Sequence, residues 1–178
     1  IMAGAPPSRP PTEATFYKSF WRSAMVWEEL ERAGVPDVVG VYCPPEGNTR
    51  LLTVVAIPQR YPGHARQAGL IASQCHAAAY LGRFTVVVDD DIDPTDMKDV
   101  WWAMTTRCDP AEDIEILRRC WSGPLDPIVQ RGKKGFNSRA VIDACRPYEW
   151  IKDFPTSVIV PADLAQQVRQ KWGKQILS

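Results

Sequence analysis

Two short runs of apolar residues, 51–57 and 84–88, restrict the folds open to this chain more than any other feature of its sequence. Between them lies a segment of small residues with helical periodicity, 64–81, and Pro62 suits the turn that opens such a helix. The run 84–88 ends in consecutive valines and predicts a strand buried on both faces of a sheet. A strand, a helix and a second strand in this order are typical of a layered α/β unit.

The same alternation continues on either side of this unit. The β-branched run 38–43 predicts a strand before it. Asp93 predicts the N-cap of a further helix that extends to about Thr106, and 113–117 predicts another strand. The order of elements therefore predicts an α/β fold with a layered, mainly parallel or mixed sheet flanked by helices. The segment 121–136 is rich in Gly and Pro and predicts a long loop.

The N-terminal part is expected to be irregular at first and then helical. Residues 1–12 are rich in proline, which disfavours a helix there. From Glu13 aromatic and apolar residues recur at helical spacing for about twenty residues, until Gly34 and Pro36 end the pattern. This aromatic face consists of Phe16, Phe20, Ala24, Trp27 and Leu30.

A final amphipathic helix is expected after Pro161. Its apolar stripe consists of Leu164, Val168, Trp172 and Ile176. Because so apolar a stripe needs a cover, we expect a docking helix that packs on its own domain or on a neighbouring subunit. The chain then divides into a lead-in over 1–12, an α/β domain over 13–160 and an oligomerisation helix over 161–178.

Charge and cysteine content exclude several classes of protein. Lys and Arg total 21, as do Asp and Glu, so the formal net charge is zero and nucleic acid is not an expected partner. No run approaches the ~20 apolar residues that cross a membrane, and the N-terminus lacks the pattern of a signal peptide. The five cysteines are scattered without a CxxC pair. This disfavours a disulfide framework and a zinc site and favours the reducing cytoplasm.

Aspartates follow the predicted buried strand, at positions 89, 90, 91 and 93. Clustered carboxylates can bind a hard cation. An EF-hand loop that starts at Asp89 fails, however, because Pro94 stands where glycine is needed. Acidic residues here also suit the positive N-terminus of the following helix, so we expect helix capping and no metal site.

Two other groups of residues are candidate sites. A helix N-terminus after Gly63 could hold an anion with help from Arg60 and Arg66, although a surface cap is the simpler interpretation. Cys75 and His76 are neighbours on a predicted helix and point about 100° apart, so they do not form a catalytic pair. Neither G-x-G-x-x-G nor a P-loop is present.

Five segments, in their order and spacing, resemble the UbiD family of decarboxylases. They are 60–65 (RYPGHA), 84–93 (FTVVVDDDID), 100–110 (VWWAMTTRCDP), 124–127 (PLDP) and 137–140 (NSRA). Together with the final helix they cover nearly the whole chain. The resemblance is to the C-terminal part of such an enzyme, a domain that builds the oligomer interface and closes one side of the active-site cleft.

The resemblance implies a chemistry and a cofactor. Family members use prenylated FMN, with a divalent metal and potassium, to remove CO2 from aromatic or α,β-unsaturated acids or to add it. Their Glu–Arg–Glu set, metal ligands and most cofactor contacts belong to an upstream domain, which would precede Ile1. We therefore expect no catalytic residue and no metal ligand in this chain, with the upstream portion and further copies of the chain as partners.

The resemblance also implies a few contact residues. In ferulate-type members a lysine three residues before a tyrosine approaches the cofactor. Tyr80 matches that tyrosine, but Ala77 stands in place of the lysine, so the lysine's contact does not carry over. By the same resemblance, Leu81, Trp121 and Leu125 are expected to line the substrate pocket, where apolar walls hold a flat acid.

Three hypotheses about function follow. The first is the oligomerisation and pocket-closing portion of a UbiD-like decarboxylase, inactive alone. The second is a non-catalytic assembly module of the same fold. The third, a small nucleotide-binding domain, lacks a phosphate loop. The start at Ile1 rather than Met is consistent with a fragment or a processed chain, and leaves proteolysis, a designed fragment and a split subunit open.

Overall fold

A five-stranded sheet forms the centre of the molecule. The computed structural model describes residues 11–130, 132, 135–158 and 160–176. The sheet has the order β1-β2-β3-β5-β4, and its strands are β1 (Gly40–Tyr42), β2 (Leu52–Ile57), β3 (Phe84–Asp89), β4 (Ile114–Trp121) and β5 (Phe136–Ala144). The three central strands β2, β3 and β5 are parallel, whereas the edge strands β1 and β4 are antiparallel to their neighbours. The predicted α/β fold with a mixed sheet is thus confirmed.

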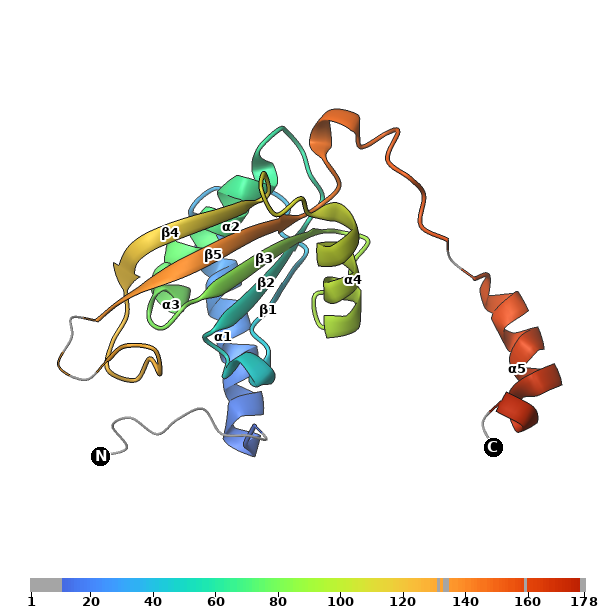
Figure 1. Cartoon of the computed structure of the whole chain (residues 1–178), viewed down its shortest axis with the longest axis horizontal. Helices are drawn as coiled ribbons and strands as arrows, with labels where there is room; N and C mark the ends of the chain where they lie inside the picture. Colours follow the sequence, from blue (N-terminus) through green and yellow to red (C-terminus); the bar gives the residue numbers. More distant parts are fainter. Residues whose placement is uncertain (1–10, 131, 133–134, 159, 177–178) are drawn as a thin grey trace.

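Helices cover both faces of this sheet. One face packs against α1 (Glu13–Arg32), α2 (His64–Gln74) and α3 (His76–Ala79), and the other against α4 (Met97–Arg107), as Figure 1 shows. Successive residues of β2 point to opposite faces. Val55 therefore joins the core under α1 and α2, and Val54 joins the core under α4. This burial on both faces explains the apolar runs in β2 and β3.

The prediction of one continuous helix over 64–81 is wrong, because the helix is interrupted at Cys75. Cys75 has extended backbone angles (φ −61°, ψ 154°), so α2 ends before it and α3 begins after it. The carboxylate of Glu29 accepts hydrogen bonds from the backbone N–H groups of His76 and Ala77 at 2.7 and 2.9 Å. A side chain of α1 thus caps α3, a tertiary contact that local periodicity does not reveal.

The predicted N-cap at Asp93 is also wrong. The side chain of Asp93 accepts from the backbone N–H and hydroxyl of Thr95, at 2.8 and 2.7 Å, and so closes a turn. Helix α4 begins at Met97, and Asp96 is its N-cap, accepting from the N–H of Lys98 at 2.8 Å. The predicted helix is therefore real but starts one turn later.

Strand β5 was not predicted. It lies between β3 and β4 in the sheet, yet its first half carries Asn137, Ser138 and Arg139, which break the apolar pattern of a central strand. Asn137 and Arg139 are buried nevertheless, since each finds polar partners inside the domain. The segment before it forms the expected loop between β4 and β5, and β4 itself continues to Trp121.

The ends of the chain expose their apolar faces. Helix α1 has the predicted bounds, but Phe16 and Phe20 are 50% and 75% exposed while Leu30 is fully buried. Helix α5 (Ala162–Ile176) stands apart from the sheet in Figure 1, with Val168 and Trp172 exposed. The predicted docking of α5 on its own domain is therefore not observed among the described residues. Residues 1–10 of the predicted lead-in and the side chain of Ile176 lie outside the described residues. No helix of the described part is long and apolar enough to cross a membrane.

Candidate functional site

An aromatic pair marks the edge of the sheet at the amino-terminal ends of the parallel strands. Tyr80 follows α3 and Trp121 ends β4, and their ring centroids are 5.2 Å apart at an interplanar angle of 52°. Gly123 lies against the Tyr80 ring so closely that any side chain at 123 would overlap it. The structure thus brings together two of the four residues that the resemblance indicated.

The other two residues occupy different surroundings. Leu81 is 5% exposed and has φ +72°, a backbone conformation that only a tightly supported leucine adopts. Its side chain is buried, directly after Tyr80 in the chain. Leu125 is 40% exposed, on the loop that follows β4. Tyr80, Trp121 and Leu125 therefore remain open to a ligand or partner, while Leu81 shapes the turn beneath.

A fully buried arginine fixes this edge from inside. Arg139 of β5 is 2% exposed and is the largest fully buried side chain of the described residues. Its guanidinium donates to the backbone oxygens of Ser73, Ala79 and Trp121, the last at 2.7 Å. It therefore joins the end of α2, the turn that carries Tyr80 and the end of β4. Sequence patterns do not reveal this role, because an arginine in a strand is ordinarily expected to be exposed.

A buried aspartate holds the neighbouring loop. Asp126 is 1% exposed and accepts from Ser122 Oγ at 2.7 Å, from Asn137 Nδ2 at 2.9 Å and from Arg83. Burial acts to raise the pKa of Asp126, but these hydrogen bonds and one from Ile128 outweigh it, so that the pKa is lowered. Two of the quoted motifs, 124–127 and 137–140, thus meet in one cluster.

Two further arginines reach the turn that carries Tyr80. Arg22 of α1 donates to the carbonyl oxygen of Ala77, and Arg50 donates to that of Tyr80 at 3.4 Å. Arg50 also lies over the Tyr80 ring, 5.6 Å from its centroid. Ala77 carries no charge, so the positive charge near this turn comes from Arg22, Arg50 and the buried Arg139. No sequence signal links positions so far apart.

The opposite, carboxyl-terminal edge of the parallel strands contains a charged network. Asp89 at the end of β3 is 1% exposed and accepts from Gln59 at 2.8 Å, Arg107 at 2.9 Å and the backbone N–H of Arg146 at 2.7 Å. The hydrogen bonds of Arg107 also hold the pKa of Asp91 below its usual range. Two of the four clustered aspartates are therefore partners of arginines, and not caps of the next helix.

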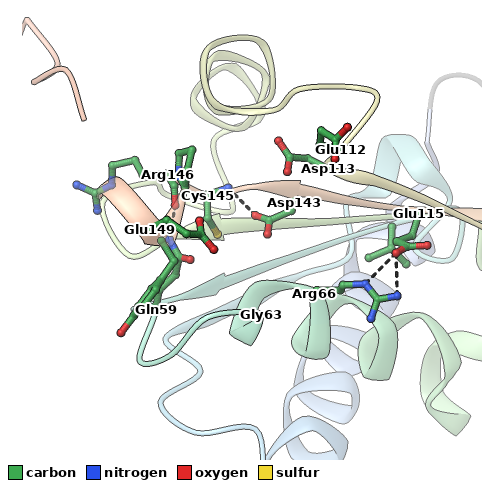
Figure 2. A pocket seen from close by; sticks show the side chains of 13 residues that line it. Gln59, Gly63, Arg66, Glu112, Asp113, Glu115, Asp143, Cys145, Arg146 and Glu149 are labelled. Atoms are coloured by element: carbon green, nitrogen blue, oxygen red, sulfur yellow. Dashed lines mark hydrogen bonds and ion pairs between the residues drawn. The ribbon is translucent and has the colours of Figure 1, made fainter. Parts of the chain in front are cut away.

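A cavity of about 240 Å³ opens beside this network (Figure 2). Figure 2 shows Asp143 pointing toward Cys145 at the end of β5, and Glu112 and Asp113, before β4, line the same cavity. Burial, with a smaller contribution from Asp113, raises the pKa of Asp143 from 3.8 to about 6. Asp143 also accepts from the backbone N–H of Cys145 at 2.9 Å.

This shift predicts a stabilising substitution, Asp143→Asn. The pKa of Asp143 is higher in the folded chain, so the stability that its protonation provides is complete below pH 3.8 and is lost as the pH rises through about 6. At neutral pH the half-buried carboxylate is therefore unfavourable, and Asn is expected to raise the free energy of unfolding by about 1–3 kcal/mol. Urea unfolding at a series of pH values measures this.

The exposed Glu112→Gln is the matched control, since it removes an acidic group from the same cavity without the burial. It is expected to change the stability by less than about 0.5 kcal/mol. Equal stabilities for wild type and Asp143→Asn at neutral pH would contradict the prediction.

The candidate anion site near Gly63 and the Cys75–His76 neighbours both have structural roles. Arg60 pairs with Asp37 and Arg66 with Glu115, so neither is free for an anion after Gly63.

His64 is fully buried, stacked on Tyr61, and burial lowers its pKa. Burial also raises the pKa of Cys75 to about 11, which keeps the thiol protonated beside the exposed His76. Within the described residues, no three His, Cys, Asp or Glu side chains cluster as metal ligands.

Comparison with known proteins places the fold. Residues 15–144 match the family model described as the 3-octaprenyl-4-hydroxybenzoate carboxy-lyase C-terminal domain. The chain is also similar to the UbiD-class enzyme HmfF from Pelotomaculum thermopropionicum, in complex with FMN, with 28% identity over 79% of this chain and 30% of that one and a TM-score of 0.70.

Two further solved structures extend the likeness. The open form of vanillic acid decarboxylase from Sedimentibacter hydroxybenzoicus shares 26% identity over 94% of this chain and 35% of that one, with a TM-score of 0.70. The 3,4-dihydroxybenzoic acid decarboxylase from Enterobacter cloacae shares 22% identity over 88% of this chain and 33% of that one, with a TM-score of 0.74, which shows the common fold alone. The chain spans about a third of the length of these structures.

Proposed function

The chain belongs to the UbiD carboxy-lyase family, because it matches the C-terminal domain of that family. We propose that it is the pocket-closing and oligomerising portion of a decarboxylase. In this proposal the complete enzyme removes CO2 from, or adds it to, an aromatic or α,β-unsaturated acid. The observation that carries the proposal is the Tyr80–Trp121 pair, an aromatic wall held from behind by Arg139 and beside it by Asp126.

A rigidly supported apolar wall suits a flat acid. Pockets for small molecules are lined mainly by apolar and aromatic side chains, with a few polar groups that fix orientation. Tyr80, Trp121 and Leu125 offer such a wall, and Leu81 supports the turn from the interior. Their part is to exclude water and to orient the substrate's ring, while proton transfer belongs to residues of the upstream portion.

The cofactor proposed is prenylated FMN, held mainly by the upstream portion. The half-exposed Tyr80 ring, with Arg50 above it, fits contact with a flat conjugated ring system. When bound, this cofactor supplies the electron sink for the loss of CO2. The divalent metal of the family finds no fit among the described residues, because no three His, Cys, Asp or Glu side chains cluster there.

Exposed apolar side chains indicate where partners would cover the chain. Phe20 and Trp21 on α1 are 75% and 74% exposed, and Trp121, Ile128 and Phe136 are also exposed on or beside the loop between β4 and β5. We propose that the upstream portion covers these exposed residues of α1 and of the loop between β4 and β5. The stripe of α5 serves as the oligomer contact, so that 13–160 form the domain and 161–178 the oligomerisation helix.

A non-catalytic assembly module of the same fold is the second candidate. The observation that favours it is Ala77, which lacks the cation that the resemblance places there. The two candidates differ on whether a flavin-bearing partner exists. Native mass spectrometry with an absorbance spectrum tests this difference, because a decarboxylase portion travels with a larger, flavin-containing polypeptide.

Activity of the complete protein tests the first candidate. The chain together with its upstream portion, loaded with prenylated FMN, is expected to release CO2 from at least one aryl or α,β-unsaturated acid. Because the aromatic pair contacts substrate and takes no proton, Tyr80→Ala and Trp121→Ala should each raise KM about tenfold with a smaller change in kcat. Trp101→Ala, at an exposed tryptophan of α4, is the control. A loaded, complete protein that turned over no such acid would refute the proposal.

A further inference from the structure

A second cavity, of about 300 Å³, lies at the carboxyl-terminal edge of the parallel strands, beside the Asp89 network. Its wall comes from Asp91 after β3, Arg107 at the end of α4, and Arg146 with the segment 151–157 after β5. This segment leads from the sheet toward α5 (Figure 1). Open α/β sheets bind their ligands outside this edge, in pockets of about 300 Å³ or more. The cavity therefore has the place and the size for a small molecule.

The wall of this cavity has more free hydrogen-bond donors than free acceptors. Arg146 donates through its Nε to Asp89 at 3.0 Å, but its terminal nitrogens donate no hydrogen bond to a described residue. Lys152 is exposed and has no ion-pair partner in the described part of the chain. The Nε of Arg107 is buried and also lacks a partner there. Both oxygens of Asp91 already accept from Arg107, at 2.8 and 2.7 Å, so an added acceptor would find unused donors.

The charged groups at the cavity leave one positive charge in excess. The three cations of its wall are Arg107, Arg146 and Lys152. Two carboxylates oppose them: Asp91 in the wall, and Asp89 behind it, which pairs with both arginines. Asp91 is ionised at neutral pH, because the hydrogen bonds of Arg107 hold its pKa below its usual range. Asp90 and Asp153 are exposed neighbours in sequence that do not line the cavity. The balance favours a monoanion over a dianion.

The rest of the wall suits an organic molecule. The half-buried Ile151 and Phe154, with Pro155, supply apolar surface, and Thr156 and Ser157 supply hydroxyl groups. Ligand pockets combine apolar surface with a few polar groups that fix orientation. The planar fork of a guanidinium matches the two oxygens of a carboxylate. A molecule with one carboxylate and a small apolar body would use both kinds of surface.

We propose that this cavity binds a small organic monocarboxylate, whose carboxylate is held by Arg146 and Lys152. The site does not depend on the proposed decarboxylase activity, because the Tyr80–Trp121 pair lies at the opposite edge of the sheet. A bound carboxylate would tie the segment 151–157, which leads to α5, to the arginine at the end of β5.

Thermal unfolding and calorimetric titration of the whole chain, at neutral pH and constant ionic strength, test this site. Benzoate is the probe, because it carries one carboxylate on a small apolar ring. It is expected to raise the Tm and to bind about tenfold tighter than acetate, which lacks the ring. Benzyl alcohol, which lacks the charge, should leave the Tm unchanged. Inorganic phosphate bound as tightly as benzoate would contradict a monocarboxylate site.

Variants test the charged groups of the wall. Lys152→Gln changes an exposed side chain without an ion-pair partner in the described part, so its Tm without benzoate should equal that of wild type. Its affinity for benzoate should fall about tenfold, and Arg146→Gln with Lys152→Gln should abolish binding. Asp91→Asn removes the carboxylate of the wall and frees the Arg107 fork, so its affinity should rise about fivefold.

Two control variants should bind benzoate as wild type does. Lys18→Gln removes an exposed lysine of α1, outside the cavity, and Tyr80→Ala removes half of the aromatic pair. A wild-type chain indifferent to benzoate, or a Lys152→Gln variant that binds it as wild type does, would overturn the proposal. Loss of binding in Tyr80→Ala would also overturn it, because benzoate would then occupy the aromatic wall.

Discussion

Arg139→Met is expected to lower the free energy of unfolding by about 3 kcal/mol or more. Methionine fills much of the same volume but leaves the backbone oxygens of Ser73, Ala79 and Trp121 without their shared donor. Each buried acceptor that loses its partner costs about 1–3 kcal/mol, partly offset because the desolvated guanidinium is also removed. Urea unfolding followed by circular dichroism measures the difference.

Two companion variants make this prediction specific. Arg139→Lys keeps a charge and three donors on a shorter reach, so its loss should be intermediate. Arg118→Met removes an exposed arginine of the adjacent strand β4, and the stability should change by less than about 0.5 kcal/mol. An unfolding midpoint of Arg139→Met equal to that of wild type would show that the three oxygens find other partners.

Arg139 also connects stability to the proposed function. The same guanidinium holds the turn that carries Tyr80 and the end of β4 that carries Trp121. If the wall contacts substrate, Arg139→Lys in the complete enzyme should raise KM more than it lowers kcat. A residue that only stabilised the fold would reduce the amount of active enzyme and leave KM unchanged.

Local patterns predicted the elements whose environment is simple. The bounds of α1 follow from its helical spacing and from the Gly34 and Pro36 that end it, and the strands β2 and β3 follow from apolar runs that are buried on both faces of the sheet. The break at Cys75 could not be predicted, since it depends on Glu29 of a distant helix. Strand β5 was missed because its buried polar residues resemble a loop until their partners in the folded chain are known.

The candidate site shows the same limit. Tyr80 and Trp121 came from a resemblance, and the structure finds them in contact. The groups that support them, Arg139 and Asp126, have long-range partners that no spacing rule reveals. Arg22 and Arg50 illustrate this best, because only the fold shows that two residues 28 positions apart donate hydrogen bonds to the same turn.

Asp89 lies at the carboxyl-terminal edge of the parallel strands, where its carboxylate forms ion pairs with two arginines. Arg107, whose side chain is 1% exposed, donates to Asp89 at 2.9 Å, and Arg146 donates through its Nε at 3.0 Å. Gln59 donates to the other carboxylate oxygen at 2.8 Å. These contacts join β3, the end of α4 and the segments after β2 and β5, so the carboxylate links α4 to this edge of the sheet.

Asp89→Asn is accordingly expected to lower the free energy of unfolding by about 3 kcal/mol, because it leaves a buried guanidinium with half of its charge partners. The side-chain amide of the Asp89→Asn variant would also direct its own N–H groups toward the N–H donors of Gln59, Arg107 and Arg146, which need an acceptor. Arg107 retains Asp91, which is 42% exposed and in contact with water, and this keeps the loss from being larger. Asp90→Asn, at the exposed neighbour with no described side-chain hydrogen bond, should stay within about 0.5 kcal/mol of wild type by urea unfolding. Similar losses for the two variants would mean that the general acidity of this segment, and not the buried pairing of Asp89, stabilises the fold.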